Sequence, residues 1–184
     1  MMEMLRLPLE GAAEFRTVPS RDARGWFARF FCQREMLAVN EGRQIQQINC
    51  SHNVKRGTLR GLHLQFPPHS EDKIVRCIRG RVYDVMVDLR HGSPTFGKWH
   101  AVELDADEMN MIYVPRGFAH GFQTLRDDCQ ILYLHTESHA PASEGGVRFD
   151  SPALDIHWPI PVTEISQRDR ELPLFDPSSG GIQL

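Results

Sequence analysis

Several side chains in the middle of the chain could move a proton beside a stabilised negative charge. His63 lies among hydrophobic residues, Lys73 follows a Pro-Pro turn, and Asp84 and His120 come later in strand-like segments. A histidine can take and return protons near neutral pH. A lysine in a closed cavity can stabilise an oxyanion or an enolate. Because a polar cluster in apolar surroundings is costly unless it is paired, the sequence predicts a site if these four residues converge.

Each candidate also has an ordinary structural interpretation. A lone histidine such as His63 is more often a hydrogen-bonded core residue, and most lysines are simply solvated. Tyr133, in Ile131 to Leu134, could be packed in the core, or its phenol could deliver a proton from the face opposite a base. Asp169 acquires a role only if the C-terminal tail folds back and orients the imidazole of His63.

The elements that would position these residues are short strands. Val82, Asp84 and Met86 alternate with Tyr83, Val85 and Val87, which is typical of a strand with two distinct faces. An edge strand followed by a turn is expected over 1–20, with Phe15 and Val18 as apolar contacts. Further short strands are expected over 44–50, 98–104, 111–114, 121–125 and 130–134. A short helix over 33–39 should end near Gly42. The pattern predicts an all-β sandwich or barrel.

Composition excludes several classes of function. A chain of 184 residues fits one domain, and a net charge of −3 does not indicate a basic surface for binding nucleic acid. No apolar run reaches the length of a membrane span, and the N-terminus lacks the basic start and apolar middle of a signal peptide. The four cysteines are scattered, which favours free thiols in a reducing cytoplasm.

A metal site is a further possibility, because parts of the chain imitate the two halves of a cupin motif. The imitating residues are Gly57, His63, Gly80, Pro115, Gly117 and His120. A metal cupin usually offers two histidines one residue apart, but here the second position is Gln65, a poor ligand for a transition metal. We therefore predict no metal. A metal-dependent cupin oxygenase or isomerase and a non-catalytic sugar-binding cupin remain as alternatives.

Many dispersed motifs together resemble the dTDP-4-dehydrorhamnose 3,5-epimerase family of sugar-nucleotide epimerases. The matching segments are Asp22-x-Arg24-Gly25-x-Phe27, Gln47-x-Asn49, Leu59 to His63, Lys73, Val82 to Asp88, Gly92 to Gly97, Pro115 to Phe122, Tyr133, Asp155 to Pro159 and Asp169. They occur in the family's order from about Phe15 to Asp169. The agreement is therefore far more specific than any one motif.

The resemblance implies an all-β, cupin-like antiparallel β-barrel (jelly roll) with a few short helices. The domain would span 1–184, with the barrel over about 42–140 and the N-terminal strands and C-terminal tail packed on it. The family is usually homodimeric and uses no metal or organic cofactor. Its substrate is a nucleotide-linked 4-keto-6-deoxyhexose, handled in the cytoplasm for rhamnose, lipopolysaccharide and other polysaccharide biosynthesis.

The resemblance also implies a role for individual residues. His63 would be the base, Asp169 would hold its ring, Lys73 would lie near the ketone oxygen and Tyr133 would be the acid on the opposite face. The implied substrate contacts are Arg24, Phe27, Arg29, Gln47, Asn49, Arg60, His120, His139, Glu144 and Arg168. A base, an enolate stabiliser and an opposed acid are the minimal set for epimerisation beside a carbonyl.

Two positions depart from the family pattern. Arg29 stands where the family usually carries an acid near the nucleotide base, and an arginine can only donate hydrogen bonds. His139 stands where many members have a second tyrosine in the sugar pocket.

The sequence predicts an isomerase that inverts C3 and C5 of dTDP-4-keto-6-deoxyglucose. The alternative is inversion at C3 only, or a different nucleotide such as CDP.

Overall fold

The computed structural model describes residues 2–184 and is built mainly from strands. The strands are β1 (Met2–Arg6), β2 (Ala13–Thr17), β3 (Ser20–Asp22), β4 (Gly25–Phe27), β5 (Gln47–Asn53), β6 (Leu59–Gln65), β7 (Lys73–Arg79), β8 (Arg81–Asp88), β9 (Trp99–Asp105), β10 (Asn110–Val114), β11 (Phe118–Thr124), β12 (Cys129–His135) and β13 (Glu144–Gly146). The helices are α1 (Gln33–Asn40), α2 (Gln167–Arg170) and the 3₁₀ turns η1 (Pro141–Ser143) and η2 (Pro177–Ser179). The predicted all-β class with short helices is confirmed.

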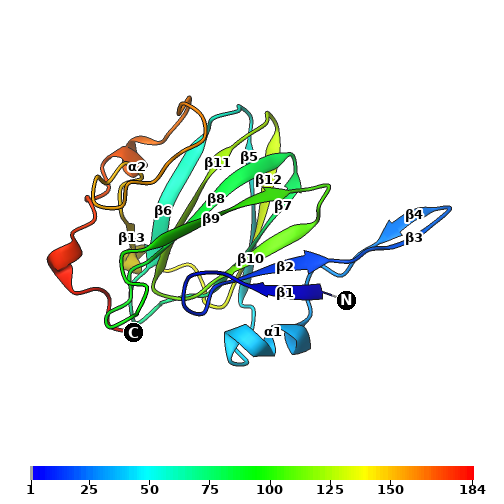
Figure 1. Ribbon diagram of the computed structural model, residues 1–184, viewed down its shortest axis with the longest axis horizontal. Helices are drawn as coiled ribbons and strands as arrows, with labels where there is room; N and C mark the ends of the chain where they lie inside the picture. The colour runs from blue at the N-terminus through cyan, green and yellow to red at the C-terminus, as the bar shows by residue number, and fades with distance from the viewer. Residues whose placement is uncertain (1) are drawn as a thin grey trace.

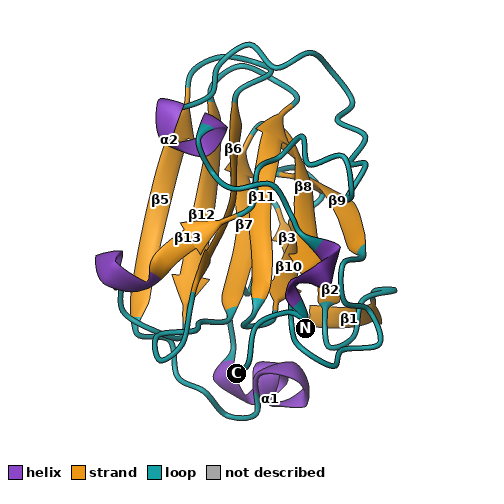
Figure 2. Cartoon of the chain, turned by 90° about the vertical axis from the view of Figure 1, so that its left-hand side faces the viewer, coloured by secondary structure: helices purple, strands orange, loops and turns teal. Residues whose placement is uncertain are grey.

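Two antiparallel sheets face each other and form the predicted jelly roll (Figure 1). One sheet has the strand order β1-β2-β10-β7-β12-β5, and the other has the order β13-β6-β11-β8-β9. Figure 2 shows the long strands side by side, with α1 beneath them and α2 near their opposite ends. Because most neighbouring strands, such as β10 and β7 or β7 and β12, are not consecutive in the chain, side chains from distant segments meet between the sheets.

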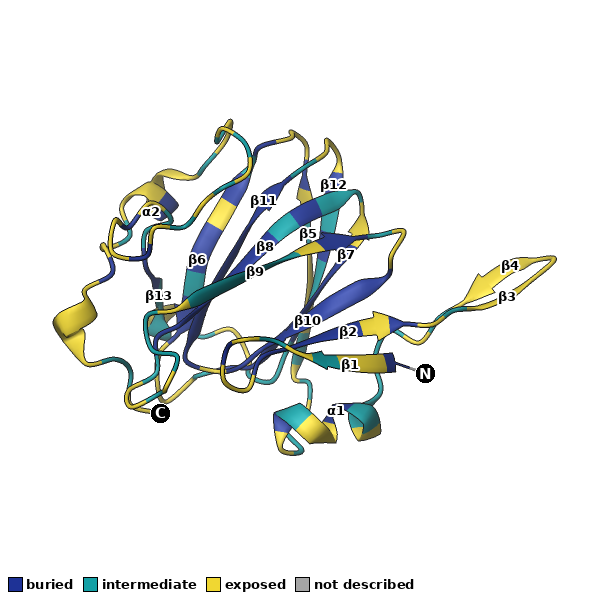
Figure 3. Ribbon diagram, in the orientation of Figure 1, coloured by how far each residue is buried: buried dark blue, intermediate teal, exposed yellow. Residues whose placement is uncertain are grey.

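The alternation predicted for β8 separates its two faces. Val82 and Met86 point between the sheets, where they pack with Phe122 and Ile131. Val85 and Val87 point outward and pack under the C-terminal tail, against Leu154, Phe175 and Trp158. All four β8 residues just named are fully buried (Figure 3), which explains why the strand carries apolar side chains on both faces. The core of the barrel is therefore continuous from one sheet to the other.

The C-terminal tail is fixed on the barrel by its own short helix. Ser166 caps α2, with its side-chain oxygen accepting a hydrogen bond from the backbone N–H of Asp169 at 3.0 Å. Serine is among the preferred residues at this position, because its hydroxyl satisfies a backbone N–H that the first turn leaves free. The cap leaves Asp169 buried against β6, which matters for the candidate site.

Near the N-terminus the structure differs from the prediction in two places. The strands β3 and β4 form a hairpin that extends away from both sheets (Figure 1). Phe15 is buried as expected, but Val18 is 62% exposed because it lies in the segment that leads out to this hairpin. The strand expected over 44–50 begins three residues later, at Gln47, since residues 41–46 form the turn after α1.

The turn after β8 is held by one buried carboxylate. Asp88 accepts hydrogen bonds from the side chains of Arg90 (2.7 and 2.9 Å), Ser93 (2.5 Å) and Thr95 (2.6 Å). Burial alone would raise the pKa of Asp88, but these donors outweigh it and hold the pKa below its usual range. The carboxylate therefore stabilises the fold above the ordinary aspartate pKa, and this contribution is lost as the pH falls through the lower folded-state value.

We expect Asp88→Asn to lower the free energy of unfolding by about 3 to 5 kcal/mol at pH 7, because it leaves a buried guanidinium without its partner charge. Urea unfolding measures the change. The difference between the two proteins should be constant from pH 7 to pH 5 and should shrink below about pH 4. The exposed residue Asp107 provides the control, Asp107→Asn. Equal stability of Asp88→Asn and wild type at pH 7 would contradict this account of the turn.

Candidate active site

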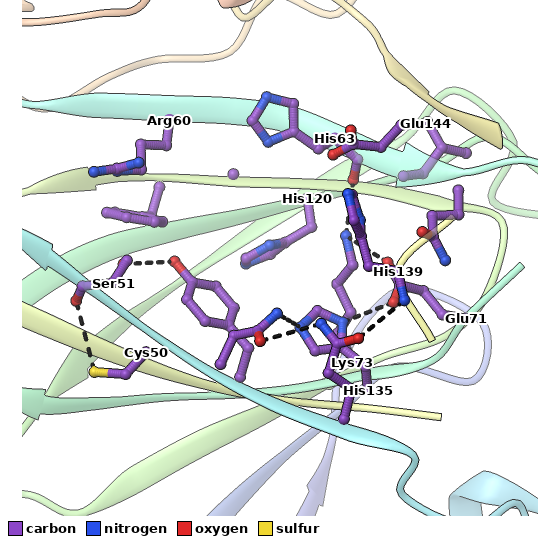
Figure 4. Close-up of a pocket in the computed structure, with 17 residues that line it drawn as sticks. Cys50, Ser51, Arg60, His63, Glu71, Lys73, His120, His135, His139 and Glu144 are labelled. Carbon is purple, nitrogen blue, oxygen red and sulfur yellow. Dashed lines mark hydrogen bonds and ion pairs between the residues drawn. The ribbon is translucent and has the colours of Figure 1, made fainter. Parts of the chain in front are cut away.

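A cavity of about 510 Å³ opens between the two sheets. This volume suits a small organic ligand. It is lined by Gln47, Asn49, Cys50, Ser51, Arg60, His63, Leu64, Gln65, Glu71, Lys73, His120, Gly121, Phe122, Tyr133, His135, His139 and Glu144 (Figure 4). Nine of the fourteen predicted site residues are in this lining, although they come from segments almost a hundred residues apart.

His63 is held by the carboxylate of Asp169. Its Nε2 lies 2.7 Å from Asp169 Oδ1, and the other carboxylate oxygen accepts the backbone N–H of Gly61 at 3.0 Å. Burial would raise the pKa of Asp169, but the hydrogen bonds from His63 and Gly61 lower it below its usual value. A carboxylate can only accept, so Nε2 carries the proton and Nδ1 of the neutral ring is free to act as a base.

Tyr133 lies on the other sheet and faces the cavity with its hydroxyl 3.0 Å from Ser51 Oγ. Burial raises the pKa of the Tyr133 phenol well above its usual value, so the group stays protonated at neutral pH. His63 is on β6 of the five-stranded sheet, whereas Tyr133 is on β12 of the six-stranded sheet. A base and a protonated acid therefore line the same cavity from two facing sheets.

Lys73 provides a positive charge in the same cavity. Its side chain is only 10% exposed, and its ammonium lies 3.2 Å from the carbonyl oxygen of His63 and 3.3 Å from Glu71 Oε1. A fixed ammonium with little water around it interacts strongly with an anion that forms nearby. Lys73 is therefore in a position to stabilise an enolate formed beside the candidate base.

His120 is part of a second histidine–carboxylate pair. Its Nε2 lies 2.8 and 3.0 Å from the two oxygens of Asp84, which is fully buried. Burial raises the pKa of Asp84, and the neighbouring His120 offsets only part of that effect. The four residues that the sequence predicted to converge, His63, Lys73, Asp84 and His120, therefore do so, with Asp84 behind the cavity wall.

The nucleotide- and sugar-binding candidates divide into three groups. Gln47, Asn49, Arg60, His120, His139 and Glu144 line the cavity. Arg168 lies beside it, with its guanidinium 2.8 Å from Glu144. Arg24, Phe27 and Arg29 are outside the cavity lining.

The third group belongs to the projecting hairpin and the segment after it. Arg24 is paired with Asp22 at 2.7 Å and its side chain is 90% exposed, while Phe27 is 80% exposed. Arg29 forms an ion pair with Glu35 on α1 at 2.6 Å. The altered base preference inferred from Arg29 stays a prediction, as does the altered sugar pocket inferred from His139.

Sequence reasoning missed Ser51, Glu71 and His135, all of which line the cavity. Each lies two residues from a predicted site residue: Ser51 from Asn49, Glu71 from Lys73 and His135 from Tyr133. Side chains two apart on a strand share a face, so this spacing was the available signal for Ser51 on β5 and His135 on β12, whereas Glu71 precedes β7. Gln65 serves the backbone: its amide donates to the carbonyl of His69 and accepts the N–H of Ala140.

Comparisons with known proteins agree with this geometry. The family model for dTDP-4-dehydrorhamnose 3,5-epimerase matches residues 6–177. The dTDP-4-dehydrorhamnose 3,5-epimerase of Sinorhizobium fredii is 40% identical over 153 residues, which are 83% of this chain and 78% of the relative.

Solved structures of such enzymes also superpose closely. The Elizabethkingia anophelis dTDP-4-dehydrorhamnose 3,5-epimerase has a TM-score of 0.90 at 37% identity, covering 95% of this chain and 96% of its own. The Legionella pneumophila dTDP-6-deoxy-D-glucose-3,5-epimerase, solved in complex with dTDP-4-keto-L-rhamnose, has a TM-score of 0.89 at 32% identity, covering 95% and 93%. The resemblance carried by the dispersed motifs is confirmed: the chain belongs to the dTDP-4-dehydrorhamnose 3,5-epimerase family.

Proposed function

We propose that this protein is an isomerase that inverts C3 and C5 of dTDP-4-keto-6-deoxyglucose to form dTDP-4-keto-L-rhamnose in deoxysugar biosynthesis. One observation carries the proposal: His63 and Tyr133 reach one cavity from facing sheets, with Lys73 in the same lining. Inversion at a carbon beside a ketone needs proton removal on one face and proton delivery on the other. Family membership supplies the substrate class.

In the proposed mechanism, Nδ1 of His63 removes the proton from C3, and the electrons of that C–H bond move into the carbonyl to form an enolate. The ammonium of Lys73 stabilises the negative charge on the oxygen. The Tyr133 hydroxyl then donates its proton to C3 from the other face. Solvent then takes the proton from His63 and returns one to Tyr133, and the same steps at C5 complete the second inversion. Asp169 keeps the His63 ring in the orientation that exposes Nδ1.

The nucleotide and the sugar would be held by the polar residues around the catalytic set. We assign this role to Gln47, Asn49, Arg60, His120, His139, Glu144 and Arg168. A guanidinium such as that of Arg60 suits a phosphate, because its N–H groups match two oxygens at once. Asn53 Oδ1 already accepts from Arg60 Nε at 2.6 Å, which orients the guanidinium. The four cysteines are free, which fits a reducing cytoplasm as the site of the reaction.

We further propose that the protein is a homodimer in which each projecting hairpin completes the partner's cavity. Trp26 and Phe27 on the hairpin are 51% and 80% exposed, and Ile48 on β5, at the edge of the six-stranded sheet, is 61% exposed. Apolar side chains gathered on a protruding segment are typical of an interaction site. Arg24, Phe27 and Arg29 would then contact substrate from the second copy.

Complementation between two inactive variants tests the exchange. Arg24→Ala and His63→Ala subunits carrying different tags are co-expressed, and the mixed dimer is isolated. If the hairpins are exchanged, one of its two cavities holds both native residues, so the dimer should show about half of the wild-type activity. If each hairpin serves its own barrel, no cavity is intact, and activity no higher than that of the Arg24→Ala dimer would overturn the exchange.

The reaction itself is tested with purified protein and dTDP-4-keto-6-deoxyglucose. The product is identified by proton NMR, because the coupling constants of the ring protons report the configuration at C3 and C5. We expect inversion at both carbons. Inversion at C3 alone would replace this function by a 3-epimerase and point to His139 as the cause. No product with this substrate, but product with a CDP-linked ketosugar, would assign a different nucleotide and point to Arg29.

A further inference from the structure

A row of hydrogen-bonded side chains runs along the six-stranded wall of the cavity. His135 Nδ1 lies 2.7 Å from Glu71 Oε2, and His135 Nε2 lies 3.4 Å from Asn49 Nδ2. Asn49 Oδ1 accepts from Gln47 Nε2 at 3.1 Å, and Lys73 is ion-paired with Glu71 at 3.3 Å. Figure 4 shows Glu71, Lys73 and His135 gathered together at one side of the cavity. The proposed mechanism uses only Lys73 from this group.

The direction of every bond in the row is fixed from its two ends. At one end, the backbone N–H of His139 can only donate, so the atom facing it at 3.0 Å is the oxygen of Gln47. The amide nitrogen of Gln47 then donates to the oxygen of Asn49, and the Asn49 nitrogen donates to His135. That order requires Nε2 of His135 to be an acceptor and Nδ1 to carry the proton.

The other end of the row demands the same direction. Burial would raise the pKa of Glu71, but the hydrogen bond from His135 and the charge of Lys73 lower it below its usual value. Glu71 is therefore a carboxylate, which accepts from both His135 Nδ1 and Lys73 Nζ. Both ends agree on one tautomer of His135, and the side chains of Glu71 and His135 are only 7% and 13% exposed.

This fixed direction determines what the amides present to the cavity. The nitrogens of Gln47 and Asn49 each carry two hydrogens, and the row uses one of them. The remaining N–H groups have no hydrogen-bond partner within residues 2–184, and both amides line the cavity. If His135 carried its proton on Nε2 instead, Asn49 would have to turn its oxygen toward the ring. Its nitrogen would then face the amide nitrogen of Gln47, and the hydrogen bond between the two amides would be lost.

We propose that Glu71 and His135 are positioning residues that hold the Gln47 and Asn49 amides with free N–H donors toward the substrate. The wall then binds an acceptor on the substrate, either a diphosphate oxygen or a sugar oxygen, and discriminates against a donor at that point. This inference rests on the proposed function and names a specificity device within the same site. His135 also stacks on Tyr133, with ring centroids 6.0 Å apart, so it is rigidly held.

Binding of two inert ligands tests the proposal. Calorimetry measures the affinity of wild type and of His135→Phe for dTDP and for dTDP-glucose, which has no ketone and does not react. Phenylalanine keeps the stacked ring but removes both nitrogens. We expect His135→Phe to bind about tenfold more weakly, the loss of one or two hydrogen bonds. Weaker binding of both ligands assigns the acceptor to the diphosphate, and weaker binding of dTDP-glucose alone assigns it to the sugar.

Kinetics separate positioning from general damage to the fold. His135→Phe should raise KM by about the same tenfold and change kcat by less than threefold, because the amides contribute to binding and not to proton transfer. The matched control is His52→Phe, since His52 also pairs with a carboxylate, Asp128 at 3.2 Å, but lies outside the cavity lining. The control should bind both ligands like wild type.

The tautomer gives a signature that needs no ligand. Nitrogen-15 NMR of histidine-labelled protein at pH 7.5 should show His135 protonated at Nδ1 and free at Nε2. Glu71→Gln should weaken this preference, because glutamine can either donate to or accept from Nδ1 and only the Gln47 end of the row still requires this tautomer. If His135 of the wild-type protein is protonated at Nε2, the inferred direction of the hydrogen bonds is wrong. Equal ligand binding by wild type and His135→Phe would overturn the inference alone, whereas wild type that binds neither ligand would overturn the proposed function as well.

Discussion

Replacing His63 by alanine is expected to lower the turnover of dTDP-4-keto-6-deoxyglucose by about a thousandfold to ten-thousandfold. A positioned general base usually contributes about a hundredfold to ten-thousandfold, and the expected factor is the upper part of that range, about 4 to 5.5 kcal/mol of transition-state stabilisation. His63 faces the cavity with Nδ1 left free by its carboxylate partner, Asp169. KM should change much less than kcat, because the proposed nucleotide contacts remain.

The same variant should no longer exchange substrate protons with solvent. Calorimetry with dTDP establishes that the cavity is intact, and His52→Ala is the control for loss of a histidine elsewhere on the barrel. A His63→Ala protein that retains more than a tenth of the wild-type kcat would exclude His63 as the base. His120 would then be the next candidate, since its ring also lines the cavity.

Replacing Tyr133 by phenylalanine should separate proton exchange from inversion. Without the phenol the proposed proton donor opposite His63 is lost, so inversion should fall by about a hundredfold to ten-thousandfold. His63 can still remove a proton and return one from solvent to the same face. In deuterated water we therefore expect deuterium at C3 and C5 with the original configuration, as measured by NMR and mass spectrometry.

Tyr83→Phe is the matched control, because Tyr83 lies on the outer face of β8 and packs against Trp158 away from the cavity. It should invert substrate like wild type. The assignment of Tyr133 fails if Tyr133→Phe inverts both centres at a normal rate. It also fails if the variant loses exchange and inversion together while binding dTDP normally, since that result would place Tyr133 in the first proton transfer.

Much of the fold could be predicted from local patterns. The alternation of β8 predicted two distinct faces, and the barrel class followed from the regular spacing of short strands. The position of Val18 could not be predicted, because a single apolar residue on the surface is ordinary and the residue type alone does not determine its burial. Its exposure depends on where the hairpin goes, which local sequence does not determine.

The site was predicted less evenly, for physical reasons. His63 and Lys73 stand out because a histidine and a lysine beside apolar strands must be paired or used. Glu71 and His135 did not stand out, because they are 64 residues apart in the chain and meet only in the folded barrel. β12 pairs with β7 and sets His135 opposite Lys73, and that register is a property of the whole barrel. The hairpin residues Arg24 and Phe27 match the family motif, but local sequence does not determine where the hairpin projects.

The most direct test of the central claim is proton NMR of dTDP-4-keto-6-deoxyglucose in deuterated water with wild-type protein. If a base and an acid on facing walls invert two centres through an enolate, deuterium must enter at both C3 and C5, and the product must have the inverted configuration at each. Incubation that leaves both protons in place, with a protein shown by calorimetry to bind dTDP, would contradict the account.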